Sequence, residues 1–261
     1  MNDGTANPST GVTLANWRLP PWNCYAFHHI AELLPVARIA HDPARVSAWS
    51  QSPRAIGEVA FSAPDGTAWT VGRMLPHTAT DGFVVLHKGR LAFEWYGNGL
   101  KPTDPHIVFS VSKSITGILA GILADRGQLD PDAPVTRYIP EAAGSVYGDC
   151  TVRHVLDMTV GIAFVENYLD ATGDFARYRA ATGWNPVADP ALASDLHSFL
   201  VTLRRDDHPH GAQFHYVSPN SDMLGWILER AGGAPYTKLL SELIWSKLGT
   251  EAHAHVTIDK L

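Results

Sequence analysis

The stretch Ser110-Val111-Ser112-Lys113 directly precedes the small and apolar run Ile115-Thr-Gly-Ile-Leu-Ala-Gly-Ile-Leu-Ala124. The run predicts a helix, and Ser110 and Lys113 lie three residues apart at its start, so they share one face. Ser112 and Ser114 are sequence neighbours of the lysine and point about 100° away around the helix. Ser110 is therefore the better candidate for a hydroxyl nucleophile with its own amine partner.

The start of this helix offers further chemistry. A helix N-terminus has unpaired backbone amides, and the amide of Ser110 itself is a candidate donor to an oxyanion. Partial desolvation of Lys113 by the apolar run would favour its neutral, proton-accepting form. A serine that caps a helix beside a surface lysine is the plainer alternative, so the motif needs support from the rest of the chain.

The composition is ordinary for a globular enzyme. The chain has 261 residues, 45% of them hydrophobic and 18% charged, enough for one large domain or two unequal lobes. Its net charge of -6 is modest and its basic residues are scattered. Nucleic acid and membranes are therefore not expected as partners, a small molecule is the expected substrate, and the oligomeric state stays open.

The predicted location is the cytoplasm. No segment of the sequence approaches the length needed to cross a bilayer, and the N-terminus, where Arg18 is the first basic residue, lacks a secretory pattern. Cys24 and Cys150 are the only two cysteines and lie far apart. Such usage is more typical of a reducing compartment than of a disulfide scaffold.

Three regions are expected along the chain. Residues 1–80, rich in proline, tryptophan and turn formers, are expected to form an N-terminal arm that packs on the core, with one amphipathic helix over 26–39. Residues 81–128 are expected to form the N-terminal part of an α/β lobe that carries the nucleophile helix. Residues 129–261 are expected to be a mostly helical lobe.

Local signals place the elements within these regions. A hairpin is predicted with strands over 83–86 and 91–96, and Gly127 is placed to end the nucleophile helix in the left-handed conformation. Further helices are predicted after a Thr151 cap, over 222–230 with Asn220 or Ser221 as cap, and over 236–247.

A tyrosine downstream supplies a partner for the serine and the lysine. Tyr216 precedes the helix predicted over 222–230. Beside a lysine ammonium its phenolate would be stabilised and could take the proton of Ser110. A lone tyrosine before a helix is more often a packing residue, so this assignment depends on the serine and lysine motif.

Serine, lysine and tyrosine together resemble the serine hydrolases of the β-lactamase and penicillin-binding-protein superfamily, on the class C and esterase side. The matching stretches keep the family's order over about half of the chain; they are Phe109–Gly117, Gly127–Val135, Thr151–Thr159 and Phe214–Gly225. The branch of 6-aminohexanoate-dimer hydrolases, which cleave linear amides and in several cases short esters, is the most similar one. Sequences similar to those of that branch are found at Ala143–Tyr147, Glu166–Asp170, Gly183–Trp184 and Ser221–Trp226.

The resemblance implies a fold and a mechanism. The implied fold is α+β, with an antiparallel sheet flanked by helices plus a mostly helical lobe. The implied mechanism is an acyl-enzyme on Ser110, with proton transfer shared by Lys113 and Tyr216 and with no cofactor. Ser218 is implied to contact substrate or the lysine, and Tyr168 is implied to contact the substrate, although an ordinary half-buried tyrosine is an equally good interpretation.

Two features depart from the family pattern. The family's third motif, Lys-Thr-Gly or His-x-Gly on a strand, has no good match after Tyr216, and Lys247-Leu-Gly-Thr250 closes a predicted helix instead. The chain is therefore expected to be a C-terminally truncated fragment in which the C-terminal strands of the sheet and the second oxyanion donor are absent. The second departure is Arg179, expected in a loop, where a cation would favour a substrate carboxylate unless it is simply a solvated surface arginine.

The remaining candidates are weaker. Glu166 could orient a deacylating water, but its neighbours do not form the pattern of the branch that uses one. The histidine pairs 208/210 and 253/255 lack the spacing and carboxylate of a metal site, so no metal is expected. The sequence thus predicts a hydrolase of linear amides or short esters. A β-lactamase or D,D-peptidase, and an inactive fragment or pseudoenzyme, are the alternatives, and the preferred acyl donor stays open.

Overall fold

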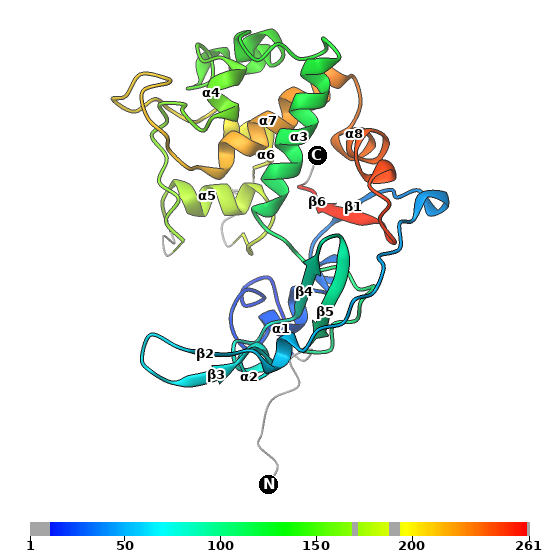
Figure 1. Cartoon of the computed structure of the whole chain (residues 1–261). Coiled ribbons are helices and arrows are strands. Elements are labelled where there is room, and N and C mark those ends of the chain that lie inside the picture. The colour runs from blue at the N-terminus through cyan, green and yellow to red at the C-terminus, as the bar shows by residue number, and fades with distance from the viewer. Residues whose placement is uncertain (1–10, 169–171, 188–193, 260–261) are drawn as a thin grey trace. The chain divides into compact units, whose positions relative to one another are not determined.

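The structure, a computed structural model, describes residues 11–168, 172–187 and 194–259 (Figure 1). The described residues form two compact units. Residues 11–33 and 46–107 make the first unit, and residues 34–45 and 108–259 make the second. The expected division at residues 80 and 128 stays a prediction, and residues 1–10 of the expected arm lie outside the described part.

The first unit consists of short elements. Its helices and strands are α1 (Asn23–Ala26), η1 (Ile30–Glu32), η3 (Ile56–Glu58), β2 (Ala60–Ser62), β3 (Ala68–Thr70), α2 (Val71–His77), β4 (Gly82–His87) and β5 (Arg90–Tyr96). β2 pairs with β3 and β4 with β5, both antiparallel. The predicted hairpin is confirmed, with Lys88 and Gly89 at its tip, both at positive φ. Positive φ at both central residues is the geometry whose twist suits a two-residue hairpin turn.

The helix predicted over 26–39 is wrong. That segment contains the end of α1, the short turn η1 and the strand β1 (Val36–Ile39). Pro35 lies in the predicted span, lacks a backbone donor and disfavours helical geometry at the residue before it. β1 then pairs with a strand more than 200 residues away, which local periodicity does not reveal.

The second unit is mostly helical. Its elements are β1, η2 (Pro43–Arg45), α3 (Val111–Asp125), η4 (Val135–Arg137), η5 (Pro140–Gly144), α4 (Val152–Leu156), α5 (Asp174–Ala181), α6 (Leu196–Leu200), α7 (Ser218–Gly232), α8 (Tyr236–Leu243), η7 (Trp245–Lys247) and β6 (Ala254–Thr257). Helix α3 packs against α7 and α8, and α7 also packs against α4 and α6 (Figure 1).

Helix α3 forms where the sequence predicts it. Leu119, Ala120 and Leu123 are buried on one face, as expected for an amphipathic helix that packs on a core. Gly127 follows the helix with φ +70, which is the left-handed conformation that glycine adopts without penalty. The Thr151 cap of α4 is also confirmed, because its hydroxyl accepts a hydrogen bond from the amide of His154.

Helix α7 begins four residues earlier than predicted. Val217 is its N-cap residue, so neither Asn220 nor Ser221 caps it. Pro219 lies in the first turn, where its fixed φ suits a helix and its missing N–H costs nothing. The early start places Ser218 on the helix itself, one turn before Asp222.

One strand follows the last helices. β6 pairs antiparallel with β1, from Val36 opposite Thr257 to Ile39 opposite Ala254. The expectation that the sheet does not return before the end of this sequence is therefore wrong for these four residues. The partner strand lies in the region expected to be an arm, so no local signal links the two.

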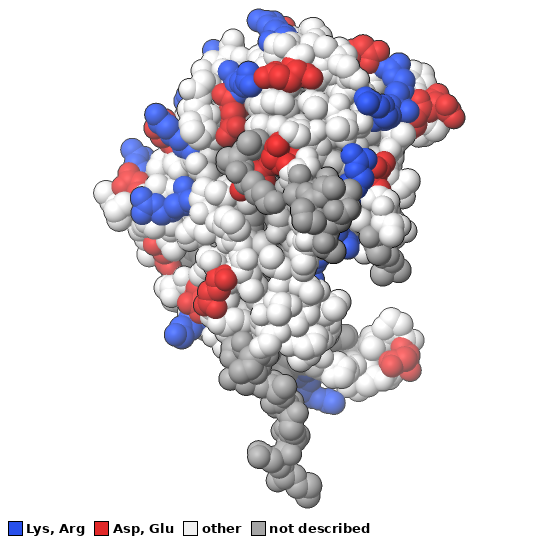
Figure 2. All heavy atoms as spheres, turned by 180° about the vertical axis from the view of Figure 1, so that it is seen from behind, with Lys and Arg blue, Asp and Glu red and all other residues white. Residues whose placement is uncertain are grey.

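Basic and acidic side chains are interspersed on the face of the molecule seen in Figure 2. Within the described ranges, no helix is long and apolar enough to cross a membrane.

Candidate active site

Ser110 lies at the start of α3, after a sharp turn. It is the exposed N-cap residue, and the preceding Phe109 has φ +43, which is rare for a residue with a side chain. Two contacts hold this turn: the Ser112 hydroxyl donates to the Phe109 carbonyl at 2.7 Å, and the Phe109 ring packs edge-on against Trp184. Backbone strain of this kind is found at functional sites, where the surrounding structure holds it in place.

Two donors converge on the Ser110 hydroxyl. The Lys113 Nζ donates to Ser110 Oγ at 2.9 Å, and the Tyr216 hydroxyl donates to the same oxygen at 2.8 Å. The Lys113 Nζ also lies 5.2 Å from the centroid of the Tyr216 ring. The structure thus brings together the three residues predicted to carry the chemistry, although Lys113 and Tyr216 are 103 positions apart in the sequence.

The backbone around the serine leaves an amide available. The amides of Val111, Ser112 and Lys113 donate to the carbonyls of residues 108, 109 and 110. In the part of the chain that the structure describes, the amide of Ser110 donates to no protein group. It remains the candidate for one oxyanion donor.

Ser218 extends the site on the side of the lysine. The Lys113 Nζ donates to Ser218 Oγ at 3.3 Å. Both the amide and the hydroxyl of Ser218 donate to the Glu166 carboxylate, at 2.7 and 3.0 Å. From the sequence, Glu166 was a candidate only for orienting a deacylating water. In the structure its carboxylate accepts hydrogen bonds from Ser218 and so holds Ser218 against Lys113.

Tyr168 joins the same group. Its side chain is 63% exposed, and its hydroxyl donates to Glu166 Oε1 at 2.6 Å. The hydrogen bond to Glu166 raises the pKa of Tyr168 to about 12, so the phenol keeps its proton at ordinary pH. An exposed phenol beside Ser218 is placed to meet a ligand, and its role stays a prediction.

Arg179 lies on helix α5, so its expected placement in a loop is wrong. Its guanidinium donates to the Tyr168 carbonyl at 2.6 Å and lies 4.3 Å from the centroid of the Phe175 ring. Arg179 therefore anchors the backbone of Tyr168 through a hydrogen bond, while a cation–π contact with Phe175 holds the guanidinium in place.

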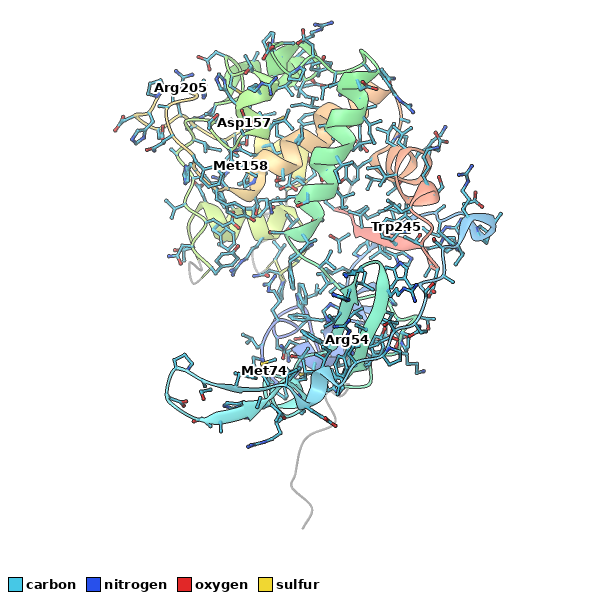
Figure 3. All side chains as sticks on the ribbon, viewed as in Figure 1. Arg54, Met74, Asp157, Met158, Arg205 and Trp245 are labelled. Carbon is cyan, nitrogen blue, oxygen red and sulfur yellow. The ribbon has the colours of Figure 1, made fainter. Side chains whose placement is uncertain are left out.

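The loop after α4 positions Tyr216. The carbonyl of Met158, labelled in Figure 3, accepts a hydrogen bond from the amide of His215 at 2.7 Å. The Met158 sulfur accepts a contact from the Asn220 side chain at 3.7 Å, and Asn220 accepts one from Tyr147 at 3.1 Å. These contacts tie Tyr216 and the start of α7 to the loop after α4. The packing of α7 against α3 then brings Tyr216 to Ser110 and Lys113.

A second carboxylate lies behind the site and was missed from the sequence. The Tyr178 hydroxyl donates to Asp222 Oδ2 at 2.6 Å. Burial is the main cause that raises the pKa of Asp222 to about 6, and burial also raises the pKa of Tyr178 well above its usual range. The sequence did contain an indication of this position, because Asp222 is a charged residue four positions after Ser218, a spacing that places both on one face of a helix.

The histidine pairs lie elsewhere. His208 contacts Asp206, His210 contacts Asp149, and His253 contacts His41. The described residues hold no group of three or more His, Cys, Asp or Glu side chains that could bind a metal ion. The absence of a metal stays a prediction.

Replacing Glu166 with glutamine is expected to destabilise the protein and slow its reaction. An amide has one acceptor oxygen where the carboxylate has two, so Ser218 keeps only one of its two hydrogen bonds to Glu166 as a donor, and the loss of a hydrogen bond to a charged group typically costs about 1.5–3 kcal/mol of the free energy of unfolding. Urea denaturation would measure this loss. Glu251→Gln, at an exposed position in the same unit, is the matched control and should leave stability unchanged; equal curves for both variants would contradict the prediction.

Comparison with known proteins shows which proteins have sequences similar to this chain. The profile of the family described as Beta-lactamase matches residues 74–259. The 6-aminohexanoate-dimer hydrolase of Paenarthrobacter ureafaciens is 38% identical over 249 residues, which cover 95% of this chain and 61% of that protein. A Beta-lactamase of Pseudomonas fluorescens is 24% identical over 186 residues, covering 67% of this chain and 45% of that protein.

A solved structure gives the same result for the fold. A protein of Bacillus anthracis, provisionally named a 6-aminohexanoate-dimer hydrolase, superposes with a TM-score of 0.88 and 25% identity over 97% of this chain and 66% of its own. The predicted α+β fold is therefore confirmed. The chain spans less than two thirds of the length of these relatives.

Proposed function

The chain belongs to the beta-lactamase family, a family of serine hydrolases, and from its site we propose that it cleaves linear amides or short esters through an acyl-enzyme on Ser110. One observation carries the proposal: a lysine amine and a tyrosine hydroxyl both reach the oxygen of a serine at the start of a helix. A hydroxyl with two adjacent proton-transfer groups is what acyl transfer requires of a nucleophile.

The proposed reaction proceeds in two halves. Ser110 Oγ attacks the substrate carbonyl while its proton passes to the Lys113 and Tyr216 pair, and the Ser110 amide stabilises the negative oxygen that forms. The pair then returns that proton to the leaving amine or alcohol as the carbon–heteroatom bond breaks. In the second half, water attacks the ester, gives up its proton to the pair and releases the acid, and Ser110 regains its proton.

The substrate class is supported by similarity and by placement. The relative that covers 95% of this chain is named a 6-aminohexanoate-dimer hydrolase, which makes a linear amide the first substrate to test. Tyr168 and Ser218 are proposed to contact the substrate because Tyr168 is exposed and bonded to the same carboxylate as Ser218, and because Ser218 touches Lys113. We also propose a cytoplasmic location, which the two free cysteines support.

A β-lactamase or D,D-peptidase is the second candidate, because the family is shared and one relative is a named Beta-lactamase. An inactive fragment or pseudoenzyme is the third, since the family's third motif has no good match after Tyr216. The three candidates predict different acylation of Ser110: by a linear amide or ester, by a β-lactam or peptide, or by no substrate.

Intact-mass analysis after treatment with a fluorophosphonate probe tests the proposal. We expect one adduct, on Ser110, and faster turnover of p-nitrophenyl acetate and a 6-aminohexanoate dimer than of nitrocefin. Preferential nitrocefin hydrolysis would favour the β-lactamase. An unlabelled serine together with no turnover of any of the three substrates would leave the inactive fragment.

A further inference from the structure

Asp222 lies on the same face of α7 as Ser218. The two residues are four apart, and residues at this spacing are neighbours on a helix surface. Ser218 accepts a hydrogen bond from Lys113 on α3, and α3 packs against α7. Asp222 is therefore one helical turn from Ser218, which contacts the Lys113 amine next to Ser110.

Tyr178 on α5 links Asp222 to this group. Its hydroxyl donates to Asp222 Oδ2 at 2.6 Å, and it also interacts with the Ser218 side chain. Three helices thus contribute one connected path, from the carboxylate through the phenol and the Ser218 hydroxyl to the Lys113 amine. The hydrogen bonds at the two ends of this path, 2.6 Å from Tyr178 to Asp222 and 3.3 Å from Lys113 to Ser218, restrict the positions of its members.

A buried carboxylate is costly unless a positive charge or hydrogen bonds compensate it. Asp222 interacts electrostatically with six titratable groups. They are Lys113, Glu166, Tyr178, Asp259, Tyr147 and Tyr236. The hydrogen bond from Tyr178 favours a charged Asp222, and so does Lys113, which is the cation among these groups. The charge of Asp222 is therefore coupled to that of the proposed catalytic amine.

We propose that Asp222 is a positioning residue for the proposed reaction, whose carboxylate, held by Tyr178, fixes the charge and position of Lys113 beside Ser110. The inference rests on the proposed function. Asp222 touches neither substrate nor Ser110 in this role, and it acts through Lys113 and Ser218.

The expected pH dependence follows from the burial of Asp222. Burial raises its pKa to about 6, so the carboxylate is charged above that pH and neutral below it. The rate of Ser110 acylation should therefore fall as the pH drops through about 6. Tyr178 donates a hydrogen bond that lowers the pKa of Asp222, so Tyr178→Phe should move this decline to higher pH.

Asp222→Asn separates positioning from stability. The amide keeps an acceptor for Tyr178 but carries no charge, so the decline near pH 6 should vanish and acylation above pH 7 should slow by about tenfold. The variant should melt no lower than the wild type at pH 8, because it lacks the cost of a buried charge. Asp125→Asn, at the exposed end of α3, is the control and should match the wild type in rate and melting temperature.

A second readout does not need catalysis. In protein labelled with ¹³C at lysine Cε, the Lys113 signal, assigned with Lys113→Arg, should shift with a midpoint near pH 6 in the wild type and not in Asp222→Asn. A Lys113 signal without that step, unchanged kinetics in Asp222→Asn, or a loss of rate that only follows a lower melting temperature would overturn the inference. If the wild type shows the step but neither binds the fluorophosphonate nor turns over an ester, the proposed function fails while the link between Asp222 and Lys113 stands.

Discussion

Ser110→Ala is expected to abolish covalent labelling and to lower amide or ester turnover by about 10⁴-fold or more. Removing the nucleophile of a serine hydrolase typically costs this much, because the remaining groups only bind the substrate and polarise its carbonyl. In this chain the hydroxyl is the atom to which both Lys113 and Tyr216 donate, so no other oxygen at the helix start has the same partners. Intact mass after fluorophosphonate treatment and steady-state turnover measure the effect.

Ser114→Ala is the matched control for this variant. Ser114 is exposed and lies one turn after Ser110 on the same helix, and among the described residues its hydroxyl has no hydrogen bond with Lys113 or Tyr216. Its variant should keep wild-type turnover, and both variants should melt at the wild-type temperature because each removes one exposed hydroxyl. Turnover that survives in Ser110→Ala would refute the assignment of the nucleophile.

Tyr216→Phe is expected to lower the rate of acylation by about 10²–10⁴-fold, the usual contribution of a general acid or base. The substitution keeps the aromatic ring that faces Lys113 and removes only the hydroxyl that lies 2.8 Å from Ser110 Oγ. Substrate binding should change little, so the loss should fall on kcat more than on KM. Single-turnover measurements with p-nitrophenyl acetate would separate acylation from the release of the acid.

Tyr138→Phe removes a comparable phenol outside the site. Its hydroxyl accepts a hydrogen bond from the amide of Asp130 at 2.8 Å, so the variant controls for the general cost of losing a tyrosine hydroxyl. A rate loss of equal size in both variants would show that Tyr216 acts through stability and not through proton transfer.

The elements with strong local signals were predictable. The hairpin, the nucleophile helix with its Gly127 end and the Thr151 cap follow from turn chemistry, apolar spacing and capping residues, and all three are present. The segment 26–39 has helical apolar spacing, but Pro35 interrupts it and strand β1 forms through its pairing with β6. Pairing across 200 residues leaves no mark on local periodicity.

The candidate site divides in the same way. Ser110, Lys113 and Tyr216 could be predicted because a nucleophile and its proton-transfer groups require particular residue types in a recognisable order. The roles of the supporting carboxylates could not be predicted. Glu166 and Asp222 lie within stretches that resemble the family, but each gains its partners through contacts with residues at least 44 positions away, such as Ser218 and Tyr178. Arg179 was placed in a loop, and its contact with the Tyr168 carbonyl became visible only on helix α5.

The sequence by itself determined the family, the α+β fold and the three residues proposed to carry the chemistry, because these depend on residue identity and on spacing within a helix. The tertiary structure decided which groups surround them. Helix α7 packs against α3, and the hydrogen bond from Tyr178 of α5 reaches Asp222 of α7. The hydrogen bonds of Glu166 hold Ser218 and Tyr168 in place. Charges and hydrogen bonds act through space, so the environment of a catalytic group is set by the fold and not by its neighbours in the chain.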